Sequence, residues 1–290
     1  ENRNMLRERF VMEKTRTCVT ELAEEIRKLG IRIPLTDINV GCDPRIGIMR
    51  NDLEFADNHM YWGHPTYLRK LWVPPVAITS ASATGAFAGG LNVMFPARMF
   101  GMPYTITEWN FVDPNPYNVE GAFLTGAYGA LQDYAGFCRF EWGITADRAK
   151  MGGFGFGNDP LQLMAMRAGS CFFLRGDVRS ATTAIPMMVP EVLPANPEWR
   201  KFPEVMQRLG LLVKTGMLVQ GSPIPAGTRA FVAPESLPDI NGKPVFSGRY
   251  TSDILAEMAK KQILPARLID LNTGRFSAET GEIELVSTRK

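Results

Sequence analysis

The feature that most constrains the fold is an alternation of strand-like and helix-like segments over the first 180 residues. The apolar patterns predict strands at residues 31–40, 55–62, 103–108 and 136–142. The spacing of apolar residues predicts helices at residues 6–29 and 119–134, and an Asp-Pro start predicts a third at residues 159–168. Strands that alternate with helical or loop connections indicate parallel βα units and an α/β fold.

The pattern changes after about residue 177. Four prolines fall between residues 185 and 199, and short apolar runs are then separated by Gly, Pro and Ser. Two helical pieces are expected, at residues 204–209 and 253–260. We therefore expect two domains: residues 1–178 carry the βα units, and residues 179–290 form a β-rich accessory region.

Composition excludes several classes of function. The net charge of +2 comes without any basic block, so nothing favours nucleic acid as a partner. The longest uncharged stretch, residues 73–97, is broken by Pro and Gly and predicts a loop, not a membrane span. The four cysteines are far apart and fit no metal spacing, so we expect small core residues, with a disulfide as the alternative, and no metal site.

The segment around Glu108 carries the clearest chemical signal. Glu108 ends an apolar strand and is followed by Trp109 and Asn110. In parallel α/β folds the carboxyl ends of strands form the active-site face. A carboxylate there can attack the anomeric carbon of a sugar, while an indole stacks on the ring and an amide binds a hydroxyl. The alternative is an ordinary surface glutamate that follows a strand.

A second signal comes from the strand that contains Asn58, His59 and Tyr61. The side chains of His59 and Tyr61 point to the same face of an extended strand, where they can orient a carboxylate and bind substrate. The alternative is a core histidine beside an aromatic ring. Only one other histidine is present in the chain, and carboxylates are scattered, so metal binding is not expected.

The last expected strand of the first region ends at Trp142. Its indole can form the floor of a sugar subsite, or it can pack in the core. Glu141, next to it, is a rival catalytic carboxylate, although an ion pair with Arg139 is the simpler interpretation.

Together these segments resemble the retaining glycoside hydrolases with a (β/α)8 barrel, of the cellulase-like or β-galactosidase-like superfamily. The motifs ITEWN (106–110), DNHMYW (57–62) and GFCRFEW (136–142) look like strands seven, six and eight of that TIM barrel. The resemblance covers about residues 1–180. It implies an incomplete barrel, with strands five to eight present, followed by part of a β-rich domain.

The resemblance also implies roles for individual residues. Glu108 matches the nucleophile, His59 and Tyr61 match residues beside it, and Trp142 matches the sugar platform. The acid/base glutamate of such enzymes ends strand four, just before a helix, and Glu1 occupies that position. The alternative is that Glu1 is merely a polar terminal residue. Strands one to four are then expected from another polypeptide segment, and the family favours an extracellular or periplasmic bacterial enzyme.

The function expected from the sequence is retaining hydrolysis of glycosidic bonds in an oligo- or polysaccharide by two glutamates, without any cofactor. Asn58, Asn110 and Trp142 would hold the sugar at the cleavage subsite. Two alternatives stay open at this point. In the first, the chain is a non-catalytic carbohydrate-binding barrel. In the second, it is an interaction module that docks the partner chain that completes the barrel.

Overall fold

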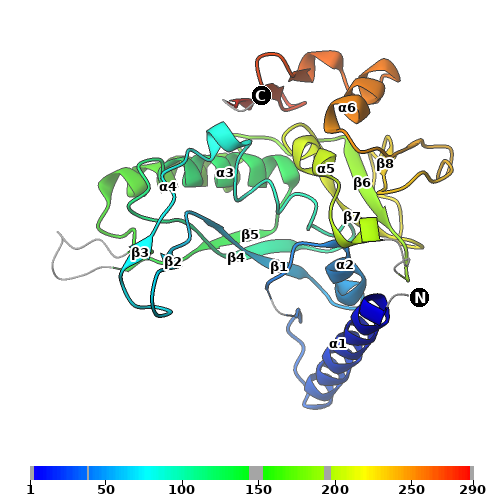
Figure 1. The fold of residues 1–290 in the computed structure, drawn as a ribbon, viewed down its shortest axis with the longest axis horizontal. Coiled ribbons are helices and arrows are strands. Elements are labelled where there is room, and N and C mark those ends of the chain that lie inside the picture. Colours follow the sequence, from blue (N-terminus) through cyan, green and yellow to red (C-terminus); the bar gives the residue numbers. More distant parts are fainter. Residues whose placement is uncertain (1–2, 38, 144–152, 193–196, 288–290) are drawn as a thin grey trace.

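The computed structural model describes residues 3–37, 39–143, 153–192 and 197–287, and these form a mixed α/β structure with two parallel sheets (Figure 1). The α-helices are α1 (Arg3–Lys28), α2 (Pro44–Arg50), α3 (Glu120–Gln132), α4 (Pro160–Phe173), α5 (Glu204–Leu209) and α6 (Thr251–Lys260). Three short 3-10 helices complete the helical elements: η1 (Thr84–Ala86), η2 (Pro197–Arg200) and η3 (Ala266–Leu268).

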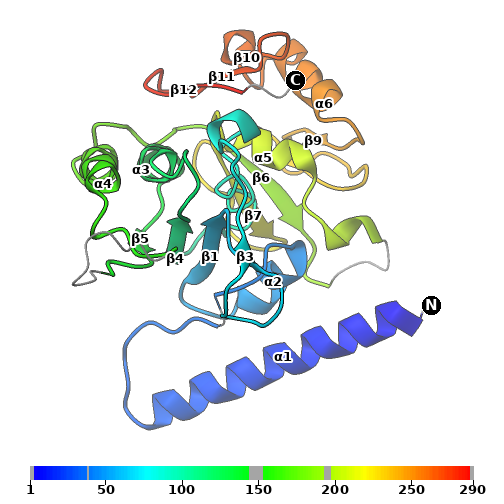
Figure 2. The same cartoon turned by 60° about the vertical axis from the view of Figure 1, so that its left-hand side comes forward.

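The first sheet joins three parallel strands in the order β1 (Ala56–Trp62), β4 (Tyr104–Phe111) and β5 (Gly136–Arg139). Helices α3 and α4 cover one of its faces, and α1 lies on the opposite side, beyond α2 (Figures 1 and 2). This order of consecutive parallel strands is the one expected for neighbouring βα units. The described residues do not form a closed barrel.

The prediction of a strand at residues 31–40 is wrong. The described residues of that segment form loop and bends, and several of their backbone groups bind side chains instead of a neighbouring strand. Arg27 donates hydrogen bonds to the carbonyls of Ile31 and Ile33, at 2.9 and 2.8 Å, and the amide of Leu35 donates to the Glu54 carboxylate. The apolar alternation there leaves Ile33 and Val40 exposed.

The second sheet is parallel, which the sequence pattern did not reveal. Its strand order is β7 (Lys214–Val219), β6 (Ala184–Val189), β8 (Phe231–Val232) and β9 (Val245–Phe246). The central strand β6 lies in the proline-rich stretch and contains Pro186, which pairs with Gly216 of β7. The region after residue 178 is therefore α/β in part and not simply β-rich.

Two small antiparallel sheets complete the described structure. One is the hairpin of β2 (Thr66–Tyr67) and β3 (Val76–Ala77), and the other joins β10 (Ile269–Asp270), β11 (Arg275–Ser277) and β12 (Glu284–Val286). The four cysteines are free, and three of them, Cys18, Cys42 and Cys138, are exposed, so the expectation of buried core cysteines is wrong for these three.

One hydrophobic core runs through both parallel sheets. The same cluster contains Ile106 of β4, Met187 of β6 and Leu285 of β12. Gln132, fully buried at the end of α3, joins the two regions: its amide nitrogen donates to the carbonyls of Gly210 and Val213, both at 2.7 Å. Its carbonyl accepts the amide of Thr215 in β7 at 3.0 Å. Residues on both sides of residue 178 thus pack in one core.

Helices α3 and α4 cross in close contact because glycines meet at the crossing. A Cβ atom on Gly126 of α3 would lie 2.3 Å from the carbonyl oxygen of Gly169 in α4. A Cβ atom on Gly169 would meet the carbonyl oxygen of Ala122 at the same distance. The helix expected at residues 159–168 continues through Gly169 to Phe173, and this glycine lies at the helix crossing instead of ending the helix.

Helix α1 is attached to the rest of the structure largely by ion pairs. Arg16 pairs with Asp52 and Arg27 with Glu54, while Glu8 pairs with Arg200 at 3.0 Å. The helix also carries exposed apolar side chains at Leu6, Phe10, Val11 and Leu22, and Leu29 just after it is exposed as well. Among the described helices, none is long and apolar enough to cross a membrane.

Candidate functional site

The face of the first sheet opposite α3 and α4 carries a carboxylate with two partners from the neighbouring strand. The Tyr61 hydroxyl donates a hydrogen bond to Oε1 of Glu108. Nε2 of His59 lies 3.3 Å from Oε2 of the same carboxylate. The side chains of His59 and Glu108 are 26% and 32% exposed, so a ligand can reach the carboxylate. The structure therefore brings together three of the predicted site residues.

A β-bulge at Thr107 places Glu108 on this face. The pairing with β1 runs from Asn58 opposite Ile106 to His59 opposite Glu108, which leaves Thr107 as the extra residue. Strict alternation would put Glu108 beside Tyr104 and Ile106, which are 1% and 0% exposed. The extra residue reverses that alternation, so Glu108 joins His59 and Tyr61, and Trp109 enters the core.

Asp57 holds the bulge in place. One oxygen of this buried carboxylate accepts the Thr105 hydroxyl at 2.6 Å and the Thr107 amide at 3.1 Å, and the other accepts the Thr107 hydroxyl. Sequence reasoning missed Asp57 as a site residue. The signal was its alternation with His59 and Tyr61, which puts all three side chains on one face of β1.

The electrostatics of Tyr61 favour a neutral phenol that donates to Glu108. Burial raises the pKa of Tyr61 well above its usual value near 10, and the hydrogen bond to Glu108 raises it further. The negative charges of Glu108 and Glu141 act in the same direction. Glu141 is thus a second carboxylate close enough to influence the hydroxyl that touches Glu108.

The second partner of the carboxylate, His59, is itself held by Asn39. The amide nitrogen of Asn39 contacts Nε2 of His59, the same ring nitrogen that faces Glu108. Asn39 lies in the loop that the sequence pattern assigned to a strand, so its role was not foreseen. The described part of residues 31–43 therefore contributes to the site through the Asn39 side chain and not through strand pairing.

Two rings contact the Tyr61 ring from neighbouring loops. The Tyr61 ring contacts His64 at 5.2 Å and Phe154 at 5.3 Å between centroids, both edge to face. Phe154 also contacts Phe140, at 5.7 Å. A carboxylate beside a phenolic hydroxyl and an imidazole, with apolar rings nearby, suits a ligand that has both hydroxyl groups and apolar faces.

Three predicted substrate-binding residues are closed off from a ligand, which corrects the role expected for them. Asn58 is fully buried and hydrogen-bonds the Tyr104 hydroxyl at 2.7 Å. Trp109 is 2% exposed, with the Arg139 guanidinium 5.1 Å from its ring. Asn110 donates to the Phe154 carbonyl at 2.6 Å and accepts from Arg139 at 3.0 Å, so it positions the neighbouring loop.

Of the two remaining predicted site residues, the structure describes Trp142 but not Glu1. Trp142 lies beyond the end of β5, is 57% exposed and contacts only the edge of Phe156 among the ring contacts of the described residues. Its indole is therefore free to stack on a ligand. Glu1 lies outside the described residues, so its proposed acid/base role stays a prediction.

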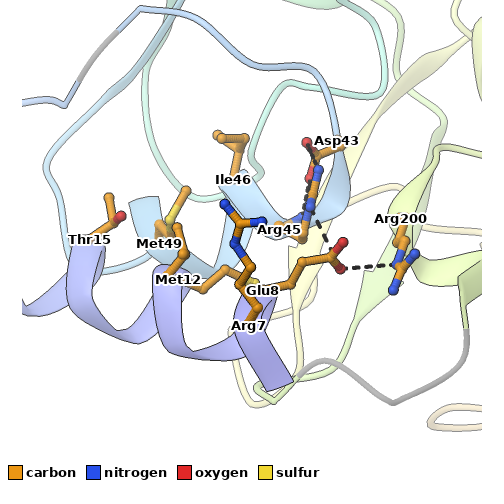
Figure 3. Close-up of a pocket in the computed structure, with 10 residues that line it drawn as sticks. Arg7, Glu8, Met12, Thr15, Asp43, Arg45, Ile46, Met49 and Arg200 are labelled. Atoms are coloured by element: carbon orange, nitrogen blue, oxygen red, sulfur yellow. Dashed lines mark hydrogen bonds and ion pairs between the residues drawn. The ribbon is translucent and has the colours of Figure 1, made fainter. Parts of the chain in front are cut away.

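A separate pocket of about 430 Å³ lies where α1 meets α2 (Figure 3). Glu8 points between Arg45 and Arg200, at 3.9 and 3.0 Å, and Arg45 also binds Asp43 at 2.8 Å. None of the predicted site residues lines this pocket, and four of its charged groups, Glu8, Asp43, Arg45 and Arg200, pair with one another. We therefore interpret it as part of the packing interface between α1 and the rest of the described structure.

The described residues contain no cluster of His, Cys, Asp and Glu able to hold a metal ion. Comparison with protein-family models finds no match for the chain. Searches of curated proteins and of solved structures find no match either. The geometry around Glu108 therefore carries the functional argument alone.

Proposed function

We propose that this chain carries the nucleophile of a retaining glycoside hydrolase site, with Glu108 as the attacking carboxylate. The observation that carries the proposal is the partly exposed Glu108 carboxylate on the open face of a parallel sheet, bound by Tyr61 and faced by His59. The Tyr61 hydrogen bond fixes one carboxylate oxygen and leaves the other to attack.

The proposed reaction proceeds by two displacements. An oxygen of Glu108 attacks the anomeric carbon, the bond to the glycosidic oxygen breaks, and an acid protonates the leaving oxygen. The same acid, now a carboxylate, then takes a proton from water, which attacks the anomeric carbon and releases Glu108. Charge on Glu108 falls in the first step and returns in the second, so a neutral donor such as Tyr61 suits both states.

The acid/base must be a second carboxyl group. Within the described residues, Glu141 is a candidate because its charge acts together with that of Glu108 on Tyr61. Glu1 is the candidate that the family resemblance favours. The two assignments differ in a measurable way, which is taken up below.

The test of the nucleophile is the variant Glu108→Gln in the whole protein. Turnover of aryl glycosides should fall at least about a thousandfold, because a neutral amide cannot form the glycosyl-enzyme. An activated 2-fluoroglycoside should add one sugar mass to the wild type at Glu108 and none to the variant. The control is Glu284→Gln, a half-exposed glutamate on β12. Labelling at any other residue would contradict the assignment.

A non-catalytic carbohydrate-binding role is the second candidate, and the exposed Trp142 favours it. In that case the wild type and Glu108→Gln would bind oligosaccharides equally and neither would turn them over. The interaction-module alternative draws support from the exposed apolar side chains of α1. A larger complex by sedimentation, without sugar binding, would favour it.

A further inference from the structure

The hairpin of β2 and β3 exposes a tryptophan at its tip. Trp72 is 65% exposed, and its neighbour Leu71 is exposed to the same extent. A bridge between Lys70 and Val73 closes the hairpin, with the Val73 amide donating to the Lys70 carbonyl at 3.1 Å. Leu71 and Trp72 are thus the two central residues of a tight turn.

The backbone at this position does not favour a tryptophan. Trp72 has a φ of 63°, in the left-handed region that bulky side chains rarely adopt. The second central position of a turn with positive φ is favoured by Gly or Asn. The backbone of the turn therefore gives no reason for a tryptophan here, and the reason lies in what the ring contacts.

Ring contacts connect Trp72 to the Glu108 carboxylate. The Trp72 ring contacts His64, with centroids 6.4 Å apart, and His64 contacts Tyr61, whose hydroxyl binds Glu108. The Tyr67 ring supports Trp72 from the hairpin strand at 5.2 Å. The exposed indole is therefore two ring contacts away from the residue that binds the candidate nucleophile.

We propose that Trp72 forms a distal subsite that stacks on a sugar unit of an extended oligosaccharide, beyond the units held at Glu108. Aromatic faces bind the apolar C–H face of a pyranose, and the polar edge of the site binds its hydroxyl groups. The inference rests on the proposed function and specifies its substrate class: chains of several sugars, in preference to mono- or disaccharides.

The test measures binding to the whole Glu108→Gln protein by calorimetry. The probes are β-1,4-linked hexasaccharides of glucose, mannose, xylose and galactose, each beside its disaccharide. We expect at least one hexasaccharide to bind about tenfold more tightly than its disaccharide, a factor that corresponds to one stacking contact. In Trp72→Gly this difference should disappear, although glycine suits the turn and the hairpin stays folded. Trp72→Phe should keep part of it.

Tyr250→Ala is the matched control, because Tyr250 is 59% exposed at the start of α6. The inference is overturned if adding Trp72→Gly leaves the preference of the Glu108→Gln protein unchanged, or if no hexasaccharide binds better than its disaccharide. Failure of the hydrolase proposal looks different. Binding would then still depend on Trp72, while the wild type shows neither turnover nor labelling of Glu108.

Discussion

The phenol of Tyr61 donates a hydrogen bond to the Glu108 carboxylate across the pairing between β1 and β4. Burial and this hydrogen bond both raise the pKa of Tyr61. The phenol should therefore stay neutral at a pH where an ordinary tyrosine, with a pKa of about 10, has ionised.

The variant Tyr61→Phe tests this relationship. Because the folded pKa lies above the unfolded one, the stabilisation from neutral Tyr61 is fully present below about pH 10 and is lost as the pH rises above it. The free energy of unfolding should fall more steeply above pH 10 in the wild type than in Tyr61→Phe. Urea unfolding across the alkaline range measures both slopes, and parallel slopes would contradict the raised pKa.

Removing Asp57 should loosen the bulge that directs Glu108 to the open face. Asp57→Ala leaves the Thr107 amide and two hydroxyl groups without their acceptor, at a cost of about 3 kcal/mol in unfolding free energy. Hydrogen exchange at the Thr107 amide should accelerate more than at Ile106. The control is Asp57→Asn, which keeps one acceptor oxygen. Its unfolding free energy and its exchange rate at Thr107 should lie between those of the wild type and of Asp57→Ala. Unchanged exchange at Thr107 would show that the bulge holds without Asp57.

The acid/base assignment is open to a leaving-group experiment. If Glu141 protonates the leaving oxygen, Glu141→Gln should lower kcat strongly for poor leaving groups and little for good ones such as dinitrophenolate. Azide should then restore turnover by replacing the activated water. The same assays on Glu1→Gln discriminate the rival, because only the true acid/base variant shows both effects.

The buried ion pair of Arg50 and Asp37 should matter for stability. Their side chains are 0% and 5% exposed, and Nε of Arg50 lies 2.8 Å from Oδ1 of Asp37. Asp37→Ala removes a counter-charge of a buried guanidinium, which costs about 3–5 kcal/mol. Adding Arg50→Met to Asp37→Ala should recover much of the loss. A double variant no more stable than the single one would contradict the pairing argument.

The crossing of α3 and α4 gives the sharpest packing prediction. Gly126→Ala forces a methyl group against the backbone of Gly169, which cannot move like a side chain, so we expect a loss of about 1–3 kcal/mol or more. Gly136→Ala in β5 is the control, since its nearest neighbour would be a Thr105 methyl at 3.8 Å. Equal unfolding midpoints for the two variants would disprove the close contact.

Much of the first region was predictable because its pattern is strong. The strand at residues 55–62 and the helices at residues 6–29 and 119–134 differ from β1, α1 and α3 by at most a few residues. Periodic apolar faces and turn residues determine such elements locally. The strand at residues 31–40 failed because its alternation finds no neighbouring strand in the described structure, and side chains satisfy its backbone instead.

The site was predictable only in part because one residue changes its register. Alternation correctly placed His59 and Tyr61 on one face of β1, and the same rule puts Asn58 on the other face, against the substrate-binding role expected for it. To predict which face of β4 carries Trp109 and Asn110, one has to know where the bulge lies. The position of the bulge depends on Asp57, which lies in a strand about fifty residues away in the sequence. Contacts from Asn39 and Phe154 depend on loops, whose path a local pattern does not determine.

Gln132 makes the two parallel sheets mechanically dependent on each other. Its three backbone partners lie just before and within β7, while its own helix covers the first sheet. Loosening one sheet strips partners from the other, so heat should melt both in one transition and not in two. If a protease cut the chain near residue 178, the two fragments should stay associated up to the temperature of that single unfolding transition.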